Sequence, residues 1–195
     1  MMNKTYIIYL AAGNSQRFKE NKLLYPINGQ PLYLYGLNTI RKLLKIRQDV
    51  EVVIVANDFV IDEPHIITLK SPKSYLGVSY SIKTALNYLS LKTGIFQMLF
   101  MVSDQPFIKP STLDKMIDAF NQSSCSICTL AYQNEVGNPV LFSNKYYHEL
   151  YTLKGDQGGR KIVNQYLDDC LQYYTDDKLE LYDIDKKSDL KNIVL

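Results

Sequence analysis

Short apolar runs with the length of β-strands alternate along the chain with longer segments in which apolar residues recur every three or four positions. The first kind of run predicts strands and the second predicts amphipathic helices. The predicted strands cover residues 5–10, 50–56, 65–69, 96–103, 125–131, 139–142 and 179–184. The predicted helices run from Pro31 to Leu44, over 76–90, from after Lys109-Pro110-Ser111 through Phe120, and over about 158–168. This alternation predicts an α/β protein whose largely parallel sheet is covered on both faces.

The composition fits a single domain, residues 1–195, which is long enough to bury about 70% of the surface that its unfolded chain exposes. The 22 basic and 20 acidic side chains give a net charge of +2 and are mixed along the chain, which disfavours nucleic acid or an anionic membrane as partner. The N-terminal residues lead into a strand without a signal-peptide pattern, and no window approaches 18 uninterrupted apolar residues. We therefore expect a cytoplasmic protein.

Three cysteines are too few for a disulfide scaffold and odd in number. The spacing of Cys125 and Cys128 also occurs in redox and zinc sites, but both residues fall in a predicted strand, where residues three apart point to opposite faces. We expect these two side chains and Cys170 to be reduced thiols.

The loop after the first predicted strand combines small residues with two cations. Ala12 and Gly13 let the backbone approach a ligand closely, and Arg17 and Lys22 add positive charge. This combination suits a polyphosphate, although the spacing is neither that of a P-loop nor that of the dinucleotide fingerprint. The competing interpretation is structural, because a strand followed by a glycine-containing turn needs no ligand.

Two predicted strands end in acidic residues, Asp104 and Asp183. Ligands of open α/β sheets bind beyond the carboxyl ends of the strands, so Asp104 should reach the same edge as the first loop. A carboxylate that faces a polyphosphate needs a cation between them, and Mg²⁺ takes one or two carboxylates together with phosphate oxygens. Alternatively, Asp104 begins a turn before the following proline. Asp185 and Asp189 are explained as a turn residue and a helix cap.

Three further segments are rich in turn residues. Gly77 precedes a predicted helix whose Ser79 and Ser81 could bind a ligand or cap the helix. The other two segments are 137–142, which contains Asn138, and 155–160, which places three glycines and an arginine before a helix. Such glycines can hold an anionic group, but they ordinarily form a turn.

Taken together and in this order, the motifs resemble those of the molybdenum-cofactor cytidylyltransferases. The motifs are Leu10-Ala-Ala-Gly-Asn-Ser-Gln-Arg-Phe with Lys22-Leu-Leu, Leu76-Gly-Val-Ser-Tyr-Ser-Ile, Asp104-Gln-Pro, Gly137-Asn-Pro-Val-Leu-Phe, Gly155-Asp-Gln-Gly-Gly-Arg and Asp183-Ile-Asp. The resemblance spans nearly the whole chain. It implies the Rossmann-like, three-layer α/β/α fold of the nucleotidyltransferase superfamily, with a mostly parallel mixed sheet. Within this superfamily, Ala11-Ala12-Gly13 looks like the cytidylyl branch, because the guanylyl branch typically has Ala-Gly-Gly there.

The resemblance also implies a role for each motif. The implied nucleotide-binding residues are Leu10, Ala11, Ala12, Gly13, Asn14, Ser15, Arg17, Lys22, Gly77, Ser81 and Asp104. The implied catalytic residues are Arg17, Lys22 and Asp104, and the implied Mg²⁺ ligands are Asp104 and Asp183. The implied acceptor-binding residues are Gln105, Asn138, Asp156 and Arg160. Two positions depart from the family pattern: Lys19 stands where the family usually has glycine, and Asn138 where it has histidine.

The activity implied is Mg²⁺-dependent transfer of a cytidylyl group from CTP to the terminal phosphate of molybdopterin, with release of pyrophosphate and a molybdenum hydroxylase as recipient of the product. An ionised phosphate is already a nucleophile, which agrees with a chain that has only two histidines, His65 and His148, neither near a motif. Three alternatives stay open: GTP in place of CTP, a sugar or isoprenoid phosphate as acceptor, and a non-catalytic protein that carries the cofactor.

Overall fold

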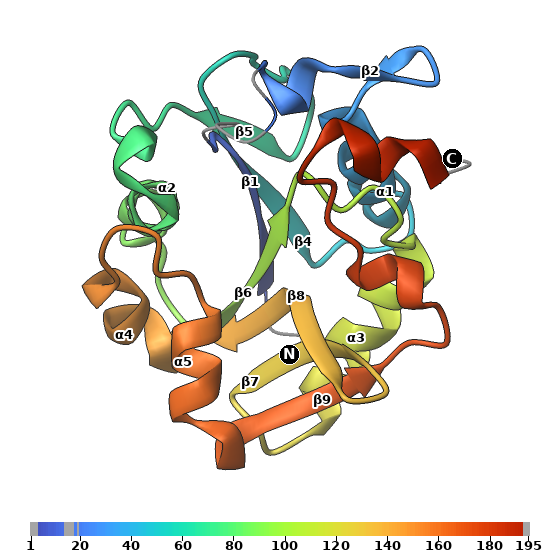
Figure 1. The fold of residues 1–195 in the computed structure, drawn as a ribbon. Coiled ribbons are helices and arrows are strands. Elements are labelled where there is room, and N and C mark those ends of the chain that lie inside the picture. The colour runs from blue at the N-terminus through green and yellow to red at the C-terminus, as the bar shows by residue number, and fades with distance from the viewer. Residues whose placement is uncertain (1–3, 14–17, 19, 193–195) are drawn as a thin grey trace.

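The computed structural model describes residues 4–13, 18 and 20–192, and its centre is a seven-stranded mixed sheet (Figure 1). In spatial order the strands are β5 (Ile66–Leu69), β4 (Val50–Ala56), β1 (Lys4–Ala11), β6 (Phe96–Val102), β8 (Glu135–Ser143), β7 (Ile127–Tyr132) and β9 (Cys170–Tyr174). Strand β8 runs antiparallel to both of its neighbours, and the other pairings in the sheet are parallel. The mostly parallel mixed sheet expected from the sequence is therefore confirmed.

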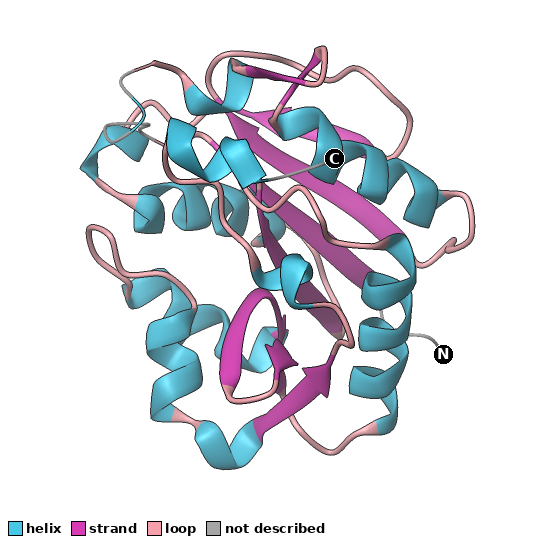
Figure 2. Cartoon of the chain, turned by 45° about the vertical axis from the view of Figure 1, so that its right-hand side comes forward, coloured by secondary structure: helices cyan, strands magenta, loops and turns pink. Residues whose placement is uncertain are grey.

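Helices cover both faces of this sheet and make three layers (Figure 2). One face carries α1 (Tyr33–Leu44) and α3 (Pro110–Gln122), and the other carries α2 (Val78–Leu89), α4 (Tyr147–Thr152) and α5 (Arg160–Gln165). The central strands are buried on both sides, which explains why their sequences are continuously apolar rather than alternating. None of the helices in the described ranges is long and apolar enough to cross a membrane.

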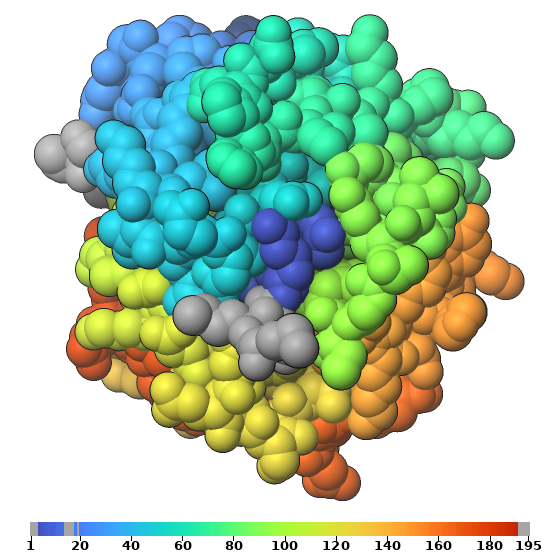
Figure 3. Space-filling view, turned by 180° about the vertical axis from the view of Figure 1, so that it is seen from behind, coloured from blue at the N-terminus to red at the C-terminus, as the bar shows by residue number. Residues whose placement is uncertain are grey.

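The parallel strands begin together at one edge of the sheet and end together at the other. Figure 3 shows the beginning of β1, in dark blue, at the surface between the segment before β4, in cyan, and the segment before β6, in light green. The carboxyl ends of β1 and β6 lie side by side at the opposite edge, because Leu10 of β1 pairs with Val102 of β6. The loops that follow these two strands, which hold the predicted phosphate and metal residues, therefore share that edge.

The first helix begins later than its sequence pattern predicts. Two short strands, β2 (Pro26–Ile27) and β3 (Gln30–Pro31), pair as a hairpin, so Pro31 closes a strand and α1 begins at Tyr33. Asn28 and Gly29 both have positive φ angles, 47° and 84°, as a tight hairpin turn of the Asn-Gly type requires. The helix predicted over 158–168 is also shorter, since α5 is followed by a 3₁₀ turn over Leu167–Asp169.

The strand predicted over 179–184 is wrong. Residues Lys178–Leu181 form a 3₁₀ turn, and the last strand of the sheet is β9. The reason is Glu180, whose side chain is only 1% exposed and accepts hydrogen bonds from the Lys109 backbone N–H and the hydroxyls of Thr112 and Thr175. A carboxylate is favoured at the N-terminus of a helix, and Glu180 takes this place for α3. In an alternating strand this residue would instead have faced outward.

The cysteines are free thiols at the edge of the sheet. Cys128 is buried in β7, and burial raises the pKa of its thiol to about 12. Burial also raises the pKa of the Cys170 thiol, to about 11. Because the thiolate is the reactive and metal-binding form, these two side chains are inert at neutral pH.

Candidate active site

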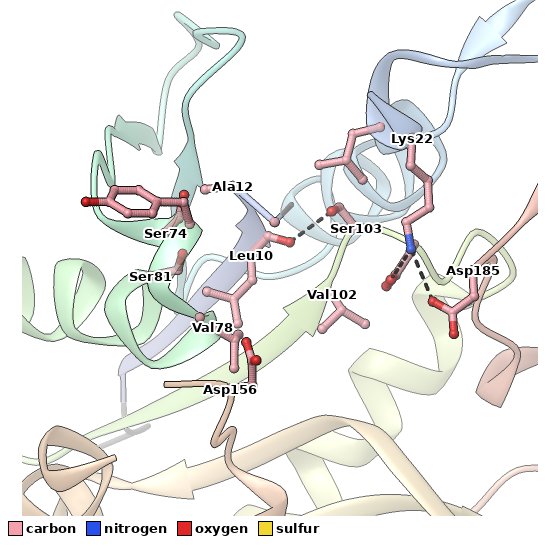
Figure 4. Close-up of a pocket in the computed structure, with 15 residues that line it drawn as sticks. Leu10, Ala12, Lys22, Ser74, Val78, Ser81, Val102, Ser103, Asp156 and Asp185 are labelled. Atoms are coloured by element: carbon pink, nitrogen blue, oxygen red, sulfur yellow. Dashed lines mark hydrogen bonds and ion pairs between the residues drawn. The ribbon is translucent and has the colours of Figure 1, made fainter. Parts of the chain in front are cut away.

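A cavity of about 430 Å³ opens at the carboxyl ends of β1 and β6 (Figure 4). It is bounded by the loop after β1, the start of α2, the loop after β6, and two segments from the last third of the chain that contain Asp156 and Asp185. Seven residues predicted to bind the nucleotide line this first pocket: Leu10, Ala12, Gly13, Lys22, Gly77, Ser81 and Asp104. The structure thus brings together three motifs that are up to about ninety residues apart in the sequence.

The ends of β1 and β6 are held together by Ser103. Its backbone N–H and its hydroxyl both donate to the carbonyl oxygen of Leu10, at 3.2 and 2.9 Å. Asp104 follows directly and is therefore placed against the loop after β1. The chain turns at residues 103–104, and Asp104 lines the pocket within this turn.

One end of the first pocket is charged. The ammonium of Lys22 lies 2.9 Å from Oδ2 of Asp104 and 3.4 Å from Oδ1 of Asp185. The Lys22 side chain is only 12% exposed, against 25% for Asp104 and 52% for Asp185. It projects from a 3₁₀ turn, Lys22–Leu24, which the side chain of Asn21 caps by accepting a hydrogen bond from the Leu23 N–H. Figure 4 shows this cluster on the side of the pocket opposite Ser81 and Ala12.

Asp183 reaches the same region without being part of a strand. The neighbouring Ile184 N–H donates to the carbonyl oxygen of Asp104 at 2.9 Å and holds the 182–185 segment against the end of β6. Asp183 is accessible to solvent at the wall of a second cavity, but the surrounding protein partly desolvates it. This desolvation, followed by the negative charge of Asp104, raises the pKa of Asp183 to about 6, against a hydrogen bond from Gln105 that lowers it.

These carboxylates fit a divalent cation whose remaining coordination positions are filled by the substrate. Within the described ranges, no three His, Cys, Asp or Glu side chains are placed to enclose a metal. Mg²⁺ does not need such a cage, because it binds through one or two carboxylates and fills its remaining positions with phosphate oxygens and water. Desolvation is the largest cause of the raised pKa of Asp183, and the negative charge of Asp104 adds to it, so the two carboxylates lie close enough to interact.

The start of α2 is packed against the loop that contains Asp156. Gly77 has a φ of +122°, and a Cβ at this position would lie 2.2 Å from the carbonyl carbon of Gly155 and 2.6 Å from the backbone nitrogen of Asp156. The Ser79 N–H also donates to the Gly155 carbonyl at 3.1 Å. Only glycine allows this approach, which places Asp156 in the first pocket with the predicted nucleotide residues rather than with the predicted acceptor residues.

Replacing Gly77 with alanine should therefore displace the 155–156 loop. We expect a lower melting temperature, because an unfavourable backbone conformation alone costs about 1–3 kcal/mol, and weaker nucleotide binding, because the pocket wall moves. Thermal unfolding with and without nucleotide measures both effects. Gly94→Ala is the matched control, since Gly94 also has a positive φ, of +87°, but has open space around its Cβ position and lies outside the pocket. Equal effects of the two substitutions would show that strain, not the contact with the loop, determines the loss.

A second cavity, of about 200 Å³, has Asp183 at its wall. Three of the four predicted acceptor residues line it: Gln105, Asn138 and Arg160. Glu135 and Thr129 also line this second pocket, and no motif indicated them. Asp104 lines the first pocket, and its neighbour Gln105 lines the second together with Asp183, so each pocket has one of the two acids predicted to bind the metal.

The remaining predicted site residues either do not line a pocket or lie outside the described residues. Ala11 is buried in β1, and Ser79 is fully buried in α2, so neither lines a pocket. Asn14, Ser15, Arg17 and Lys19 lie outside the residues that the structure describes.

Seven residues that line the first pocket are not among the site residues predicted from the sequence: Leu23, Ser74, Tyr75, Val78, Val102, Ser103 and Asp185. The turn predicted for Asp185 does form, since its N–H donates to Asp189 at 2.9 Å, but its carboxylate pairs with Lys22. Ser74 accepts a hydrogen bond from Asn57 at 2.9 Å. The local sequence around Ser74 does not indicate this contact.

Comparison with known proteins gives one family. A model described as the MobA-like NTP transferase domain matches residues 7–170. A probable molybdenum cofactor guanylyltransferase from Thermococcus sibiricus is 30% identical over 136 residues, and the bifunctional protein GlmU from Nitrosomonas eutropha is 30% identical over 139 residues. The matches cover 68% and 67% of this chain but only 65% and 29% of those proteins, so the chain spans less than two thirds of either relative.

Solved structures share the fold. The crystal structure of Rv0371c from Mycobacterium tuberculosis H37Rv superposes with a TM-score of 0.77 at 21% identity, over 97% of this chain and 96% of that one. A structure described as a complex of Rv0371C with manganese superposes with a TM-score of 0.70 at 20% identity, over 91% and 90% of the two chains. At these identities the likeness concerns the fold.

Proposed function

Because the chain belongs to the MobA-like NTP transferase family, we propose that it is a nucleotidyltransferase that moves a nucleoside monophosphate from an NTP to a phosphorylated acceptor. More specifically, we propose CTP as the donor and molybdopterin phosphate as the acceptor. The observation that carries the proposal is the presence of two pockets, with Asp104 at the wall of the first and Asp183, together with Gln105, at the wall of the second. A transfer between two substrates needs two such sites and a shared point where the reacting groups meet.

The first pocket has the polarity that an NTP needs. Its charged end, with Lys22 and Asp104, suits the triphosphate, and its other end, with Ala12, Gly77 and Ser81, suits the base. The pairing of Lys22 with Asp104 and Asp185 keeps the ammonium extended into the pocket before any substrate is present. Lys22 then offers a preorganised positive charge to the phosphates, as expected for a site that stabilises charge developing during the reaction.

The proposed reaction needs no covalent intermediate with the protein, because the acceptor phosphate is itself the nucleophile. An oxygen of the acceptor phosphate attacks the α-phosphorus of the NTP, the bond from this phosphorus to the bridging oxygen breaks, and pyrophosphate leaves with the electron pair. Asp104 and Asp183 would hold Mg²⁺, whose bound form supplies charge neutralisation at the phosphates. Lys22 neutralises the leaving pyrophosphate, and Arg17 would add a second cation. The second pocket, with Arg160 at its wall, would hold the acceptor in line with the α-phosphorus.

The choice of CTP rests on Ala12. Ala12 is only 5% exposed and lines the end of the pocket opposite Lys22, where its methyl group leaves less room for a purine than glycine would. The Thermococcus relative is named a guanylyltransferase, so the two nucleotides are the alternatives that must be compared.

We expect CTP with Mg²⁺ to raise the melting temperature of the protein more than GTP or ATP does, because the ligand that binds the native state more tightly stabilises it more. Thermal unfolding at equal nucleotide concentrations makes the comparison, and Ala12→Gly should narrow the difference between CTP and GTP. A larger shift with GTP in the unmodified protein would contradict the choice of CTP and leave the nucleotidyltransferase proposal standing.

The acceptor is tested with labelled nucleotide and purified molybdopterin, a sugar phosphate or an isoprenoid phosphate. Label transferred to molybdopterin, with pyrophosphate released in equal amount, supports the proposal. Transfer to either of the other phosphates alone would contradict the acceptor that we propose. Nucleotide binding without transfer to any of them would favour a protein that carries the cofactor.

A further inference from the structure

Asp156 is an anion inside a pocket that is proposed to hold a triphosphate. Its carboxylate makes no hydrogen bond or ion pair with any residue that the structure describes, and it lines the first pocket beside the start of α2. Figure 4 shows it next to Val78, on the side of the pocket away from Lys22 and Asp185. A carboxylate in this position would repel phosphates. It can bind a part of the nucleotide that donates hydrogen bonds.

The position of Asp156 is set by the fold rather than by a loose loop. Its backbone packs directly against Gly77, and the preceding Gly155 accepts a hydrogen bond from the Ser79 N–H. The turn is closed by Gln157, whose N–H donates to the Lys154 carbonyl and whose side chain accepts from the Lys154 N–H, both at 3.1 Å. Asp156 is exposed to solvent, and the backbone that carries its carboxylate is preorganised for a ligand.

The middle of the pocket is the part that a ribose would occupy. Leu10 and Val102, at the paired ends of β1 and β6, form apolar surface between the charged end and the end that holds Ala12 and Ser81. A nucleotide with its phosphates at Lys22 and its base at Ser81 must lay its sugar across this middle part. Val78 and Asp156 border the same part from α2 and from the 154–159 loop.

We propose that Asp156 accepts hydrogen bonds from the 2′- and 3′-hydroxyls of the nucleotide, and so makes the site selective for ribonucleotides over deoxyribonucleotides. A single carboxylate can accept from both hydroxyls of the sugar, and an acidic residue plays this part for the 2′-hydroxyl in dinucleotide sites. The proposal rests on the proposed nucleotidyltransferase function and is independent of the choice between CTP and GTP. The proposal assigns Asp156 to the nucleotide, whereas the resemblance implies that Asp156 binds the acceptor.

The test compares nucleotides that differ only in the sugar. Binding of CTP, 2′-deoxy-CTP and 2′,3′-dideoxy-CTP with Mg²⁺ is measured by calorimetry on the wild-type protein and on Asp156→Ala. We expect Asp156→Ala to weaken CTP binding by about 10- to 100-fold, the usual range for hydrogen bonds to a charged group, and to leave 2′,3′-dideoxy-CTP binding essentially unchanged. The wild-type protein should bind 2′,3′-dideoxy-CTP more weakly than CTP.

Asp168→Ala is the matched control, because it removes an exposed carboxylate with the same change in net charge but lines neither pocket. Equal weakening of CTP and dideoxy-CTP by Asp156→Ala would overturn the ribose assignment, and so would unchanged nucleotide binding combined with a higher KM for the acceptor. If the wild-type protein prefers GTP, the same sugar series made with GTP decides the matter. A wild-type protein that binds no nucleotide would overturn the proposed function itself.

Discussion

Replacing Asp104 with alanine or asparagine is expected to lower the rate of nucleotidyl transfer by about a thousandfold, the upper part of the range for losing one preorganised electrostatic contact. Asp104 is the acid that the ends of β1 and β6 present to the pocket, and it is the partner of Lys22 at 2.9 Å. Without it, Asp183 alone is left to hold the cation, and the Lys22 ammonium keeps only the longer contact to Asp185. Single-turnover rates with saturating nucleotide measure the effect on the chemical step.

The Asp104 variants should remain folded, which separates catalysis from stability. The carbonyl oxygen of Asp104, which holds the 182–185 segment through Ile184, is backbone and survives both substitutions. The melting temperature without nucleotide should therefore stay close to that of the wild-type protein, and Asp168→Ala should match the wild type in both measurements. An Asp104→Ala variant with full activity would exclude the metal role and favour a different cation site.

The sequence predicts the central strands well and the last part of the chain poorly, for a physical reason. Strands such as β1 and β6 are buried on both faces, so their continuous apolar runs predict buried strands correctly. Around Glu180 the same kind of local pattern is misleading, because its side chain is turned inward by the start of α3, some seventy residues earlier in the chain. Contacts of that range have no local signature.

The residues of the site also differ in how well the sequence predicts them. Asp104 and Lys22 could be predicted because each lies in a motif that follows a strand or a turn. The placement of Asp156 depends on the close approach of Gly77 and Gly155, two glycines whose sequence context suggests only turns. The strand that the sequence predicts before Asp183 does not form, and a backbone hydrogen bond from Ile184 to Asp104 holds the 182–185 segment against the end of β6 instead.

Replacing Lys22 with methionine should change metal binding and catalysis in opposite directions. Methionine keeps much of the apolar stem but removes the charge, and we expect transfer to fall by about a hundredfold, because one preorganised cation at the phosphates is lost. In the free protein, however, the Lys22 ammonium already neutralises Asp104 and Asp185 at 2.9 and 3.4 Å, so a divalent cation must compete with it. The variant should therefore bind Mn²⁺ more tightly than the wild type in the absence of nucleotide.

Titration with Mn²⁺, followed by electron paramagnetic resonance, and steady-state kinetics with CTP measure the two effects on the same preparations. Lys145→Met is the matched control, since it breaks a lysine–carboxylate pair of similar length, 2.8 Å to Asp169, that lies outside both pockets. Equal Mn²⁺ affinity in Lys22→Met and wild type would show that the ammonium and the cation do not share Asp104. A loss of transfer together with tighter Mn²⁺ binding would instead mean that Lys22 has two successive partners, the carboxylates before the nucleotide binds and the phosphates afterwards.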